Sequence, residues 1–278
     1  MDVVPDAVAL LRRVDAYLDA APDGDATVID VGPLRAFVSS APWPFYVRPR
    51  PDLDLTGAAA VTADDVRRAA DVLEAAEQDV SFEWVEQLVP SLGPALLEAG
   101  YVVHSHPLLT LDLASPHPTD GPPGTSSRAR ILAGGSPDLQ ASLAVSDVGF
   151  DAAGTAVGPA GVVERAAAAA ALDGPLLEHV GRRVRERRSV LAVLDDPHDG
   201  IVATGWHQPI GDTTEVVGVA TLPTHRRRGA AAEVVDRLLH DARVHGCTLA
   251  LLTASDDAVA RVYERLGFTK VGTCGAAG

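Results

Sequence analysis

The fold is decided by residues 214–231, which read TEVVGVATLPTHRRRGAA in a chain of 278 residues. The first nine are rich in β-branched side chains, which predicts a strand that Pro223 ends. The basic run Arg226–Arg228 and then Gly229 follow it. Further apolar residues recur at the spacing of an amphipathic helix, namely Ala231, Val234, Val235, Leu238, Leu239 and Ala242, until Gly246. The stretch therefore predicts a strand, a basic glycine turn and a helix.

Such a turn suits an anionic ligand. The first amides of a helix lack intrahelical acceptors and carry the positive end of its dipole, so they can bind a phosphate. Gly229 lets the backbone come close, and Ala230 and Ala231 leave space. The chain as a whole has a formal charge of -15, which repels nucleic acids and anionic membranes. The arginines reverse that charge locally, which favours one small polyanion over a plain basic surface turn.

A second patterned stretch, residues 248–268, follows the helix. Thr248–Thr253 is typical of a strand, and Ser255 is the predicted N-cap of a helix that Gly267 closes. The apolar face of that helix consists of Val259, Val262, Tyr263 and Leu266.

The two stretches together resemble the GNAT superfamily of N-acyltransferases. The signature of its acyl-CoA-binding motif is Arg or Gln, two residues, Gly, one residue, then Gly or Ala. Arg226, Gly229 and Ala231 occupy those positions, and the second stretch is similar to the late helix of the family. The resemblance covers residues 128–278. It implies an α/β (α+β) GNAT fold, in which helices flank a mixed central sheet.

The resemblance also implies a ligand and its site. Acetyl-CoA is the expected cosubstrate, and no metal is expected. The strands at 214–222 and 248–253 should separate and admit the pantetheine arm between them. The cofactor-binding residues carried over onto this chain are Val217, Val219, Ala220, Thr221, Arg226, Arg227, Arg228, Gly229, Ala230, Ala231, Asp256 and Tyr263.

Acyl transfer to an amine needs a base, because an alkyl ammonium with a pKa near ~10 is mostly protonated at neutral pH. Glu215 is the candidate, since it precedes Arg226 by eleven residues, a spacing at which some family members carry their base. Strand periodicity places the side chains of Val217, Val219 and Thr221 on its face. His207 and Asp147 are alternative bases. In the non-catalytic alternative, Glu215 is a carboxylate at the edge of the core.

Tyr263 stands at the family position of the general acid that protonates the departing CoA thiolate. The two cysteines, Cys247 and Cys274, lack the context of a catalytic triad. Direct transfer from acetyl-CoA to the amine is therefore expected, without a cysteine acyl-enzyme.

Residues 114–127 form the predicted linker, because they hold four prolines and two glycines. They separate an N-terminal α/β domain, 1–113, from the GNAT domain, 128–278. Residues 96–103 parallel 265–271 in having a helix end, Gly, an aromatic residue and a strand, which favours a degenerate GNAT-like copy in the first half. Only ten residues follow Phe268, so either the last strand is absent or another segment, such as 108–113, completes the sheet.

The function predicted from these features is transfer of an acetyl group from acetyl-CoA to a primary amine of a small molecule or peptide. A non-catalytic acyl-CoA-binding or regulatory module is the alternative. The expected partners are an acyl-CoA and an amine acceptor, with no nucleic acid and no membrane, and a homodimer is compatible with the sequence. The low cysteine content and the absence of a signal or membrane-spanning segment indicate a cytoplasmic location.

Overall fold

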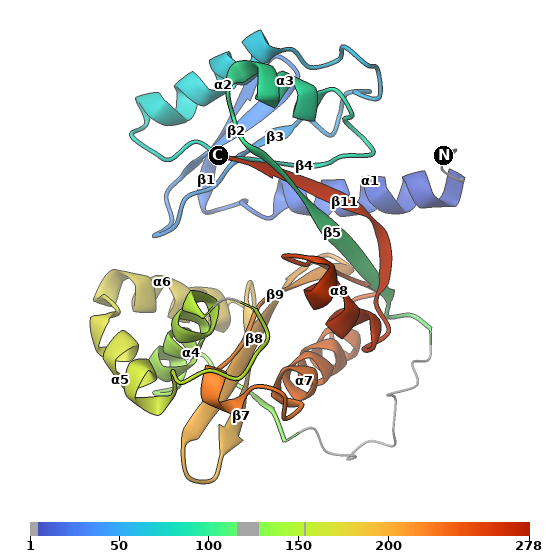
Figure 1. Cartoon of the computed structure of the whole chain (residues 1–278). Helices are drawn as coiled ribbons and strands as arrows, with labels where there is room; N and C mark the ends of the chain where they lie inside the picture. The colour runs from blue at the N-terminus through green and yellow to red at the C-terminus, as the bar shows by residue number, and fades with distance from the viewer. Residues whose placement is uncertain (1–4, 116–127, 153) are drawn as a thin grey trace. The chain divides into compact units, whose positions relative to one another are not determined.

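The computed structural model describes residues 5–115, 128–152 and 154–278, and it divides into two compact units (Figure 1). Unit 1 comprises Met1–Leu109, Thr253–Ala260 and Thr269–Gly278. Unit 2 comprises Thr110–Leu252 and Arg261–Phe268. The predicted linker lies almost wholly outside the described residues, so the division into 1–113 and 128–278 stays a prediction. Within the described ranges, no helix combines the length and the apolarity that crossing a bilayer requires.

Unit 1 is a mixed sheet with helices on both faces. Its elements are α1 (Pro5–Ala20), β1 (Ala26–Val31), β2 (Leu34–Ser39), β3 (Val47–Pro49), α2 (Ala63–Ala75), β4 (Phe82–Val85), α3 (Leu92–Ala99), the first part of β5 (Val103–Asp112) and β11 (Thr269–Ala277). The strands lie in the order β1-β2-β3-β4-β11-β5. Figure 1 shows α2 and α3 on one side of this sheet and α1 on the other. Thr62 and Asp65 form a capping box at the start of α2.

Unit 2 contains the remaining strands, which also run in mixed directions. Its elements are β6 (Arg130–Ile131), α4 (Leu139–Asp151), α5 (Val162–Ala171), α6 (Gly174–Arg185), β7 (Val190–Asp196), β8 (Gly200–Ile210), β9 (Thr213–Thr221), the 3-10 turn η1 (Pro223–His225), α7 (Ala230–Val244), β10 (Leu249–Thr253) and α8 (Asp257–Glu264), through which the division between the units runs. The strands lie in the order β5-β10-β9-β8-β7-β6. Strand β10 is parallel to β9, and the pairs β9–β8, β8–β7 and β7–β6 are antiparallel. Figure 1 shows α7 on one face and α4 on the other.

The end of the chain corrects one expectation. A last strand is present, since β11 extends over Thr269–Ala277 and pairs antiparallel with β4 of unit 1, from Cys274–Val85 to Ala277–Phe82. A Cβ on Gly275 would collide with the Trp84 ring, so glycine lets the two strands pair beside that side chain. In unit 2 the end of β5 lies next to β10, and the amide of Leu113 donates to the oxygen of Thr248 at 2.8 Å. Residues 110–113 therefore complete the unit 2 sheet, as predicted.

A bulge in β9 corrects a second expectation. Trp206 pairs with Val217 but Thr204 pairs with Ala220, so β9 carries one more residue than β8 over this interval. Gly218 takes up the distortion with a φ of +61°. One inserted residue moves every later side chain to the opposite face. Val219 and Thr221 consequently do not share a face with Glu215.

Candidate functional site

The turn between β9 and α7 has the form that the sequence predicts. After η1, Arg227 adopts a φ of +62° and Gly229 a φ of +81°, and α7 begins at Ala230. Gly229 is the N-cap and has no side chain that could satisfy the first amides of α7. These amides and the positive end of the helix dipole are therefore available to an anion.

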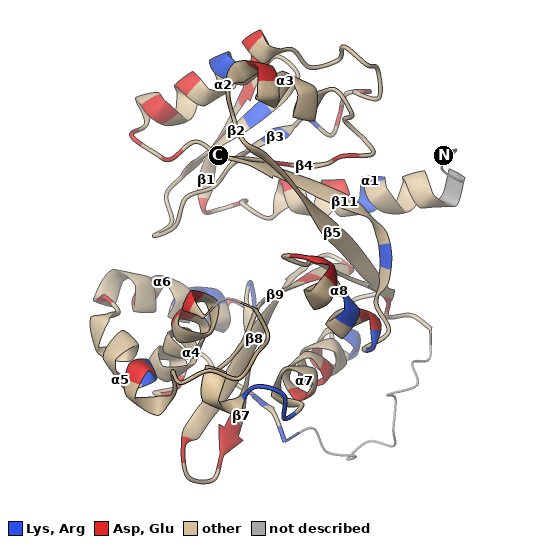
Figure 2. Cartoon of the chain, viewed as in Figure 1, with Lys and Arg blue, Asp and Glu red and all other residues tan. Residues whose placement is uncertain are grey.

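Positive charge collects at this turn. Arg227 and Arg228 are exposed, and Figure 2 shows the segment that leads into α7 in blue. Glu233 in the first turn of α7 would oppose a phosphate, but Arg128 donates to its carboxylate from Nη2 at 2.5 Å and from Nε at 3.1 Å. The hydrogen bonds and charge of Arg128 hold the pKa of Glu233 below its usual value. This arginine carries no signal of its role, because nothing in the sequence links two residues 105 positions apart.

Arg226 is oriented differently from its two neighbours. Its guanidinium is half-buried and donates to the carbonyl oxygens of Gly149 at 2.6 Å and Ala152 at 2.9 Å. Those oxygens lie at the C-terminal end of α4. The first residue of the signature therefore uses its side chain inside unit 2, and the backbone amides and the other two arginines remain for a ligand.

The parallel strands β9 and β10 pair over a short distance. The register runs Thr213–Leu249, Thr214–Ala250 and Glu215–Leu251, and no described pair follows. The part of β9 beyond Glu215 still pairs with β8, through Val217, Ala220 and Thr221. The sequence assigns the pantetheine arm to this edge of β9, and that assignment stays a prediction.

Glu215 lies half-buried at the last pair of the parallel ladder, opposite Gln208 of β8. Thr214 lies on the opposite face of β9 from Glu215 and forms a hydrogen bond with His207. The other ring nitrogen of His207 lies 3.1 Å from Asp241 of α7, so this face of β9 is turned to α7. Glu215 and Val217 are therefore turned toward α4. Beyond the bulge the faces exchange, since a Cβ on Gly205 would lie 3.1 Å from Val219 and 2.8 Å from Val234 of α7.

The predicted role of Glu215 as base implies that Glu215→Gln lowers acyl transfer about 100-fold at neutral pH, because the amide side chain cannot accept a proton from the amine. The loss should shrink as the pH approaches the pKa of the amine, ~10, where half of the amine is already neutral. Thiol release measured from pH 7 to pH 10 tests this. A loss that is independent of pH would contradict a role as base and favour a structural carboxylate.

The alternative bases differ in their access to solvent. His207 is fully buried, with Nδ1 2.9 Å from Thr214 Oγ1 and Nε2 3.1 Å from Asp241 Oδ2. Both ring nitrogens are thus engaged within the fold. Asp147 lies on α4 with an exposed side chain, and the partial burial of its carboxyl group, with the charge of Asp151 as a second cause, raises its pKa.

The α8 region places Tyr263 and Asp256 differently. In unit 2 the ring of Tyr263 packs edge-on against Phe268, with centroids 5.9 Å apart, and burial raises the pKa of Tyr263 to about 12. In unit 1 the Asp256 carboxylate accepts from the amides of Ala258 at 2.7 Å and Val259 at 2.8 Å. Asp256 is therefore the N-terminal cap of α8, and the prediction of Ser255 as the cap is wrong. A carboxylate so engaged orients the helix and would repel a phosphate.

Residues 167–268 match a family model described as Acetyltransferase (GNAT) family. The chain carries a GNAT acetyltransferase domain. A GCN5-related N-acetyltransferase from Kribbella flavida is similar with a TM-score of 0.69 and 23% identity, over 97% of this chain and 95% of that one. Another from Sphaerobacter thermophilus gives 0.53 and 17%, over 99% and 93%. A tandem GNAT protein from the clavulanic acid biosynthesis pathway gives 0.52 and 16%, over 88% and 77%. No curated protein sequence matches the chain.

These similarities confirm the predicted GNAT fold, a mixed α/β structure with helices on the sheet. The alignments extend over the first half of the chain as well, and one similar structure is a tandem GNAT protein. Residues 1–113 contain no Arg-x-x-Gly-x-Gly/Ala sequence. The GNAT signature thus occurs once, in unit 2.

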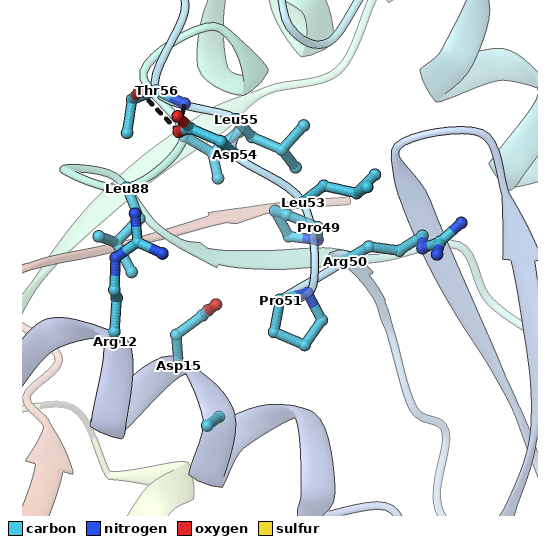
Figure 3. A pocket seen from close by; sticks show the side chains of 12 residues that line it. Arg12, Asp15, Pro49, Arg50, Pro51, Leu53, Asp54, Leu55, Thr56 and Leu88 are labelled. Atoms are coloured by element: carbon cyan, nitrogen blue, oxygen red, sulfur yellow. Dashed lines mark hydrogen bonds between the residues drawn. The ribbon is translucent and has the colours of Figure 1, made fainter.

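Two further features lie outside the predicted site. In the GNAT domain, Asp196, Asp199 and His225 bring three potential metal ligands within 4.8 Å, but His225 Nε2 is already 3.1 Å from Asp199 Oδ2. Unit 1 contains a cavity of about 160 Å³, into which the carboxylate of Asp15 points (Figure 3). The carboxylate of Asp15 also forms an ion pair through Oδ1 with Nη2 of the buried Arg48, 2.9 Å away. No sequence motif marks either feature.

Proposed function

We propose that the GNAT domain binds acetyl-CoA at the β9–α7 turn and transfers the acetyl group directly to a primary amine of a small molecule or peptide. The observation that carries the proposal is the combination of an uncapped helix N-terminus after two exposed arginines with a β9 edge that β10 leaves unpaired beyond Glu215. The turn suits the pyrophosphate, and the strand edge suits the two amides of the pantetheine arm.

The chemistry then follows from two side chains. Glu215 accepts the proton of the ammonium, directly or through a water molecule, so that the nitrogen lone pair can attack the thioester carbonyl carbon. A C–N bond forms and the carbonyl π electrons move onto oxygen. When they return, the C–S bond breaks and its electron pair leaves with sulfur. Tyr263 donates a proton to that sulfur, and the nitrogen gives up its second proton, which restores the phenol directly or through water. The products are an amide and free CoA.

The proposal extends to location and partners. Acyl-CoA and an amine acceptor are the partners, and a reducing cytoplasm suits a protein whose Cys247 and Cys274 are buried thiols. A module that binds acyl-CoA without transferring the acyl group is the second candidate. Calorimetry with acetyl-CoA followed by thiol-release assays on a panel of amines separates the two. Binding with transfer supports the enzyme, binding without transfer supports the module, and no heat contradicts both.

We expect Gly229→Ala to weaken acetyl-CoA binding at least about 10-fold, because a Cβ at a φ of +81° strains the backbone that must approach the pyrophosphate. Gly211→Ala is the matched control. Gly211 also has a positive φ, +58°, in unit 2, and a Cβ there likewise meets open space. Both variants should lose a similar ~1 kcal/mol of stability. Equal loss of affinity in the two variants would contradict a ligand at the turn.

A further inference from the structure

Arg226 connects two segments that are far apart in the sequence. Besides Gly149 and Ala152, its guanidinium donates to the oxygen of Ala156 at 3.3 Å and, from Nε, to the oxygen of Thr221 at 3.4 Å. The last carbonyls of a helix lack intrahelical donors and carry the negative end of its dipole. The cation of Arg226 therefore satisfies the end of α4 while its backbone belongs to the ligand-binding turn.

A close approach of α4 to β9 makes this reach possible. A Cβ on Gly149 would lie 2.8 Å from the Cβ of Ala220, nearer than carbon atoms pack. Glycine thus lets α4 lie directly on the end of β9. The carbonyl of Gly149 comes within 2.6 Å of the Arg226 guanidinium as a result.

The α4–α5 connection, residues 154–161, is held to the same turn by its backbone. The amide of Gly158 donates to the oxygen of Pro223 at 3.2 Å, and the amide of Thr224 donates to the oxygen of Ala160 at 3.1 Å. A Cβ on Gly161 would lie 2.9 Å from Thr224 Oγ1. The α4–α5 connection therefore lies against η1 in two places. Ala156 and Gly158 make the contacts in the middle of the connection, and Ala160 and Gly161 make those at its end.

We infer that Arg226 is a positioning residue that couples the order of the α4–α5 connection to acetyl-CoA binding at the turn. This inference rests on the proposed function. The Arg226 side chain contacts carbonyl oxygens instead of phosphate, whereas Arg227 and Arg228 supply the charge that meets the ligand. Ligand binding fixes the backbone of residues 226–231, and the guanidinium transmits that order to Gly149, Ala152 and Ala156. Ligand binding raises the equilibrium constant for ordering the connection by some factor. By reciprocity, an ordered connection raises the affinity for the ligand by that same factor.

The test compares Arg226→Gln with Arg228→Gln. Arg228 is an exposed arginine of the same turn, and within the part of the chain that the structure describes its side chain donates to the oxygen of Thr224. Calorimetry with acetyl-CoA at several salt concentrations reports phosphate contacts, because salt screens them. Hydrogen exchange of the Gly158 and Thr224 amides reports the connection. Arg226→Gln should keep the salt dependence, lose less than about fivefold in affinity, and lose about 10-fold or more of the exchange protection at both amides. Arg228→Gln should flatten the salt dependence and keep the protection.

Arg226→Lys provides the conservative comparison if Arg226→Gln folds poorly. A lysine ammonium keeps the charge but cannot bridge several carbonyls with a planar fork, so protection should be restored only in part. Unchanged protection at Gly158 in both Arg226 variants, or a flattened salt dependence in Arg226→Gln, would overturn the inference. If the wild-type protein gives no heat with acetyl-CoA, the proposed function fails, and loss of protection in the ligand-free Arg226 variants still decides whether Arg226 holds the connection.

Discussion

Replacing Tyr263 with Phe is expected to lower acetyl transfer by about 10³-fold and to leave the affinity for acetyl-CoA within about threefold of wild type. The reason is that the phenol supplies a proton to the sulfur only as the C–S bond breaks. Its ring packs against Phe268 in either variant, since the change removes one oxygen atom and retains the aromatic contact. The measurement is thiol release under saturating acetyl-CoA, with calorimetry on the same samples.

The raised pKa of Tyr263, about 12, sharpens this prediction. A phenol with that pKa stays protonated at every pH in which the enzyme is assayed. The wild-type rate should therefore show no decline caused by the phenol below about pH 11. Phe268→Leu is the matched control, because it removes the ring contact and keeps the hydroxyl. Turnover of Tyr263→Phe equal to that of wild type would show that the tyrosine is only packed.

The elements of unit 2 were predictable because local sequence and tertiary packing agree there. The run from Thr214 to Ala242 combines strand propensity, a proline stop, a glycine at a position of positive φ and an apolar stripe of helical period. Each of these signals acts within a few residues, so they mark β9, the turn and α7 without knowledge of the rest of the fold.

The predicted faces of β9 failed at one residue. Strand periodicity assumes regular pairing, and the sequence contains no feature that distinguishes Gly218 in a bulge from Gly205, which packs under α7. The bulge depends on the register with β8, which is a long-range property. Glu215 and Val217 precede it and keep their common face, while Val219 changes sides.

The fate of the chain end was also a long-range property. Thr269–Ala277 pairs with β4, a strand that lies almost two hundred residues earlier in the sequence. A count of residues after Phe268 could show that a hairpin was too long to fit, but it could not show where a single strand would pair. The role of Arg226 was hidden in the same way, because its acceptors lie on residues 149–156 and are backbone oxygens, which carry no sequence signal.

Replacing Asp241 with Asn is expected to destabilise the GNAT domain by about 2–3 kcal/mol at pH 7. Asp241 lies on α7 with only 8% of its side chain exposed, and its Oδ2 accepts from Arg187 Nη2 at 2.7 Å and faces His207 Nε2 at 3.1 Å. Burial alone would raise the pKa of Asp241, but the hydrogen bonds from His207 and Arg187 outweigh it and lower the pKa to about 2. The carboxylate thus ties α7 to β8 and to Arg187, which follows α6.

The pH dependence of this effect has a definite sign. A folded-state pKa of about 2, below the ordinary value of 3.8, means that the folded protein holds the ionised form more tightly than the unfolded chain does. The stabilisation is complete above about pH 4 and is lost as the pH falls toward 2. The difference between wild type and Asp241→Asn in urea unfolding should therefore be constant from pH 7 to pH 5 and smaller at pH 3.

Asp195→Asn makes the matched control for this measurement. Asp195 also pairs with an arginine in unit 2, Arg130 at 2.7 Å, but 41% of its side chain is exposed, against the nearly complete burial of Asp241. Solvent screens such a pair, so its loss should cost less than about 1 kcal/mol. If the two variants lose equal stability, or if the cost of Asp241→Asn is the same at pH 3 as at pH 7, the ionised carboxylate does not stabilise the fold. In that case burial does not explain which carboxylate stabilises this domain.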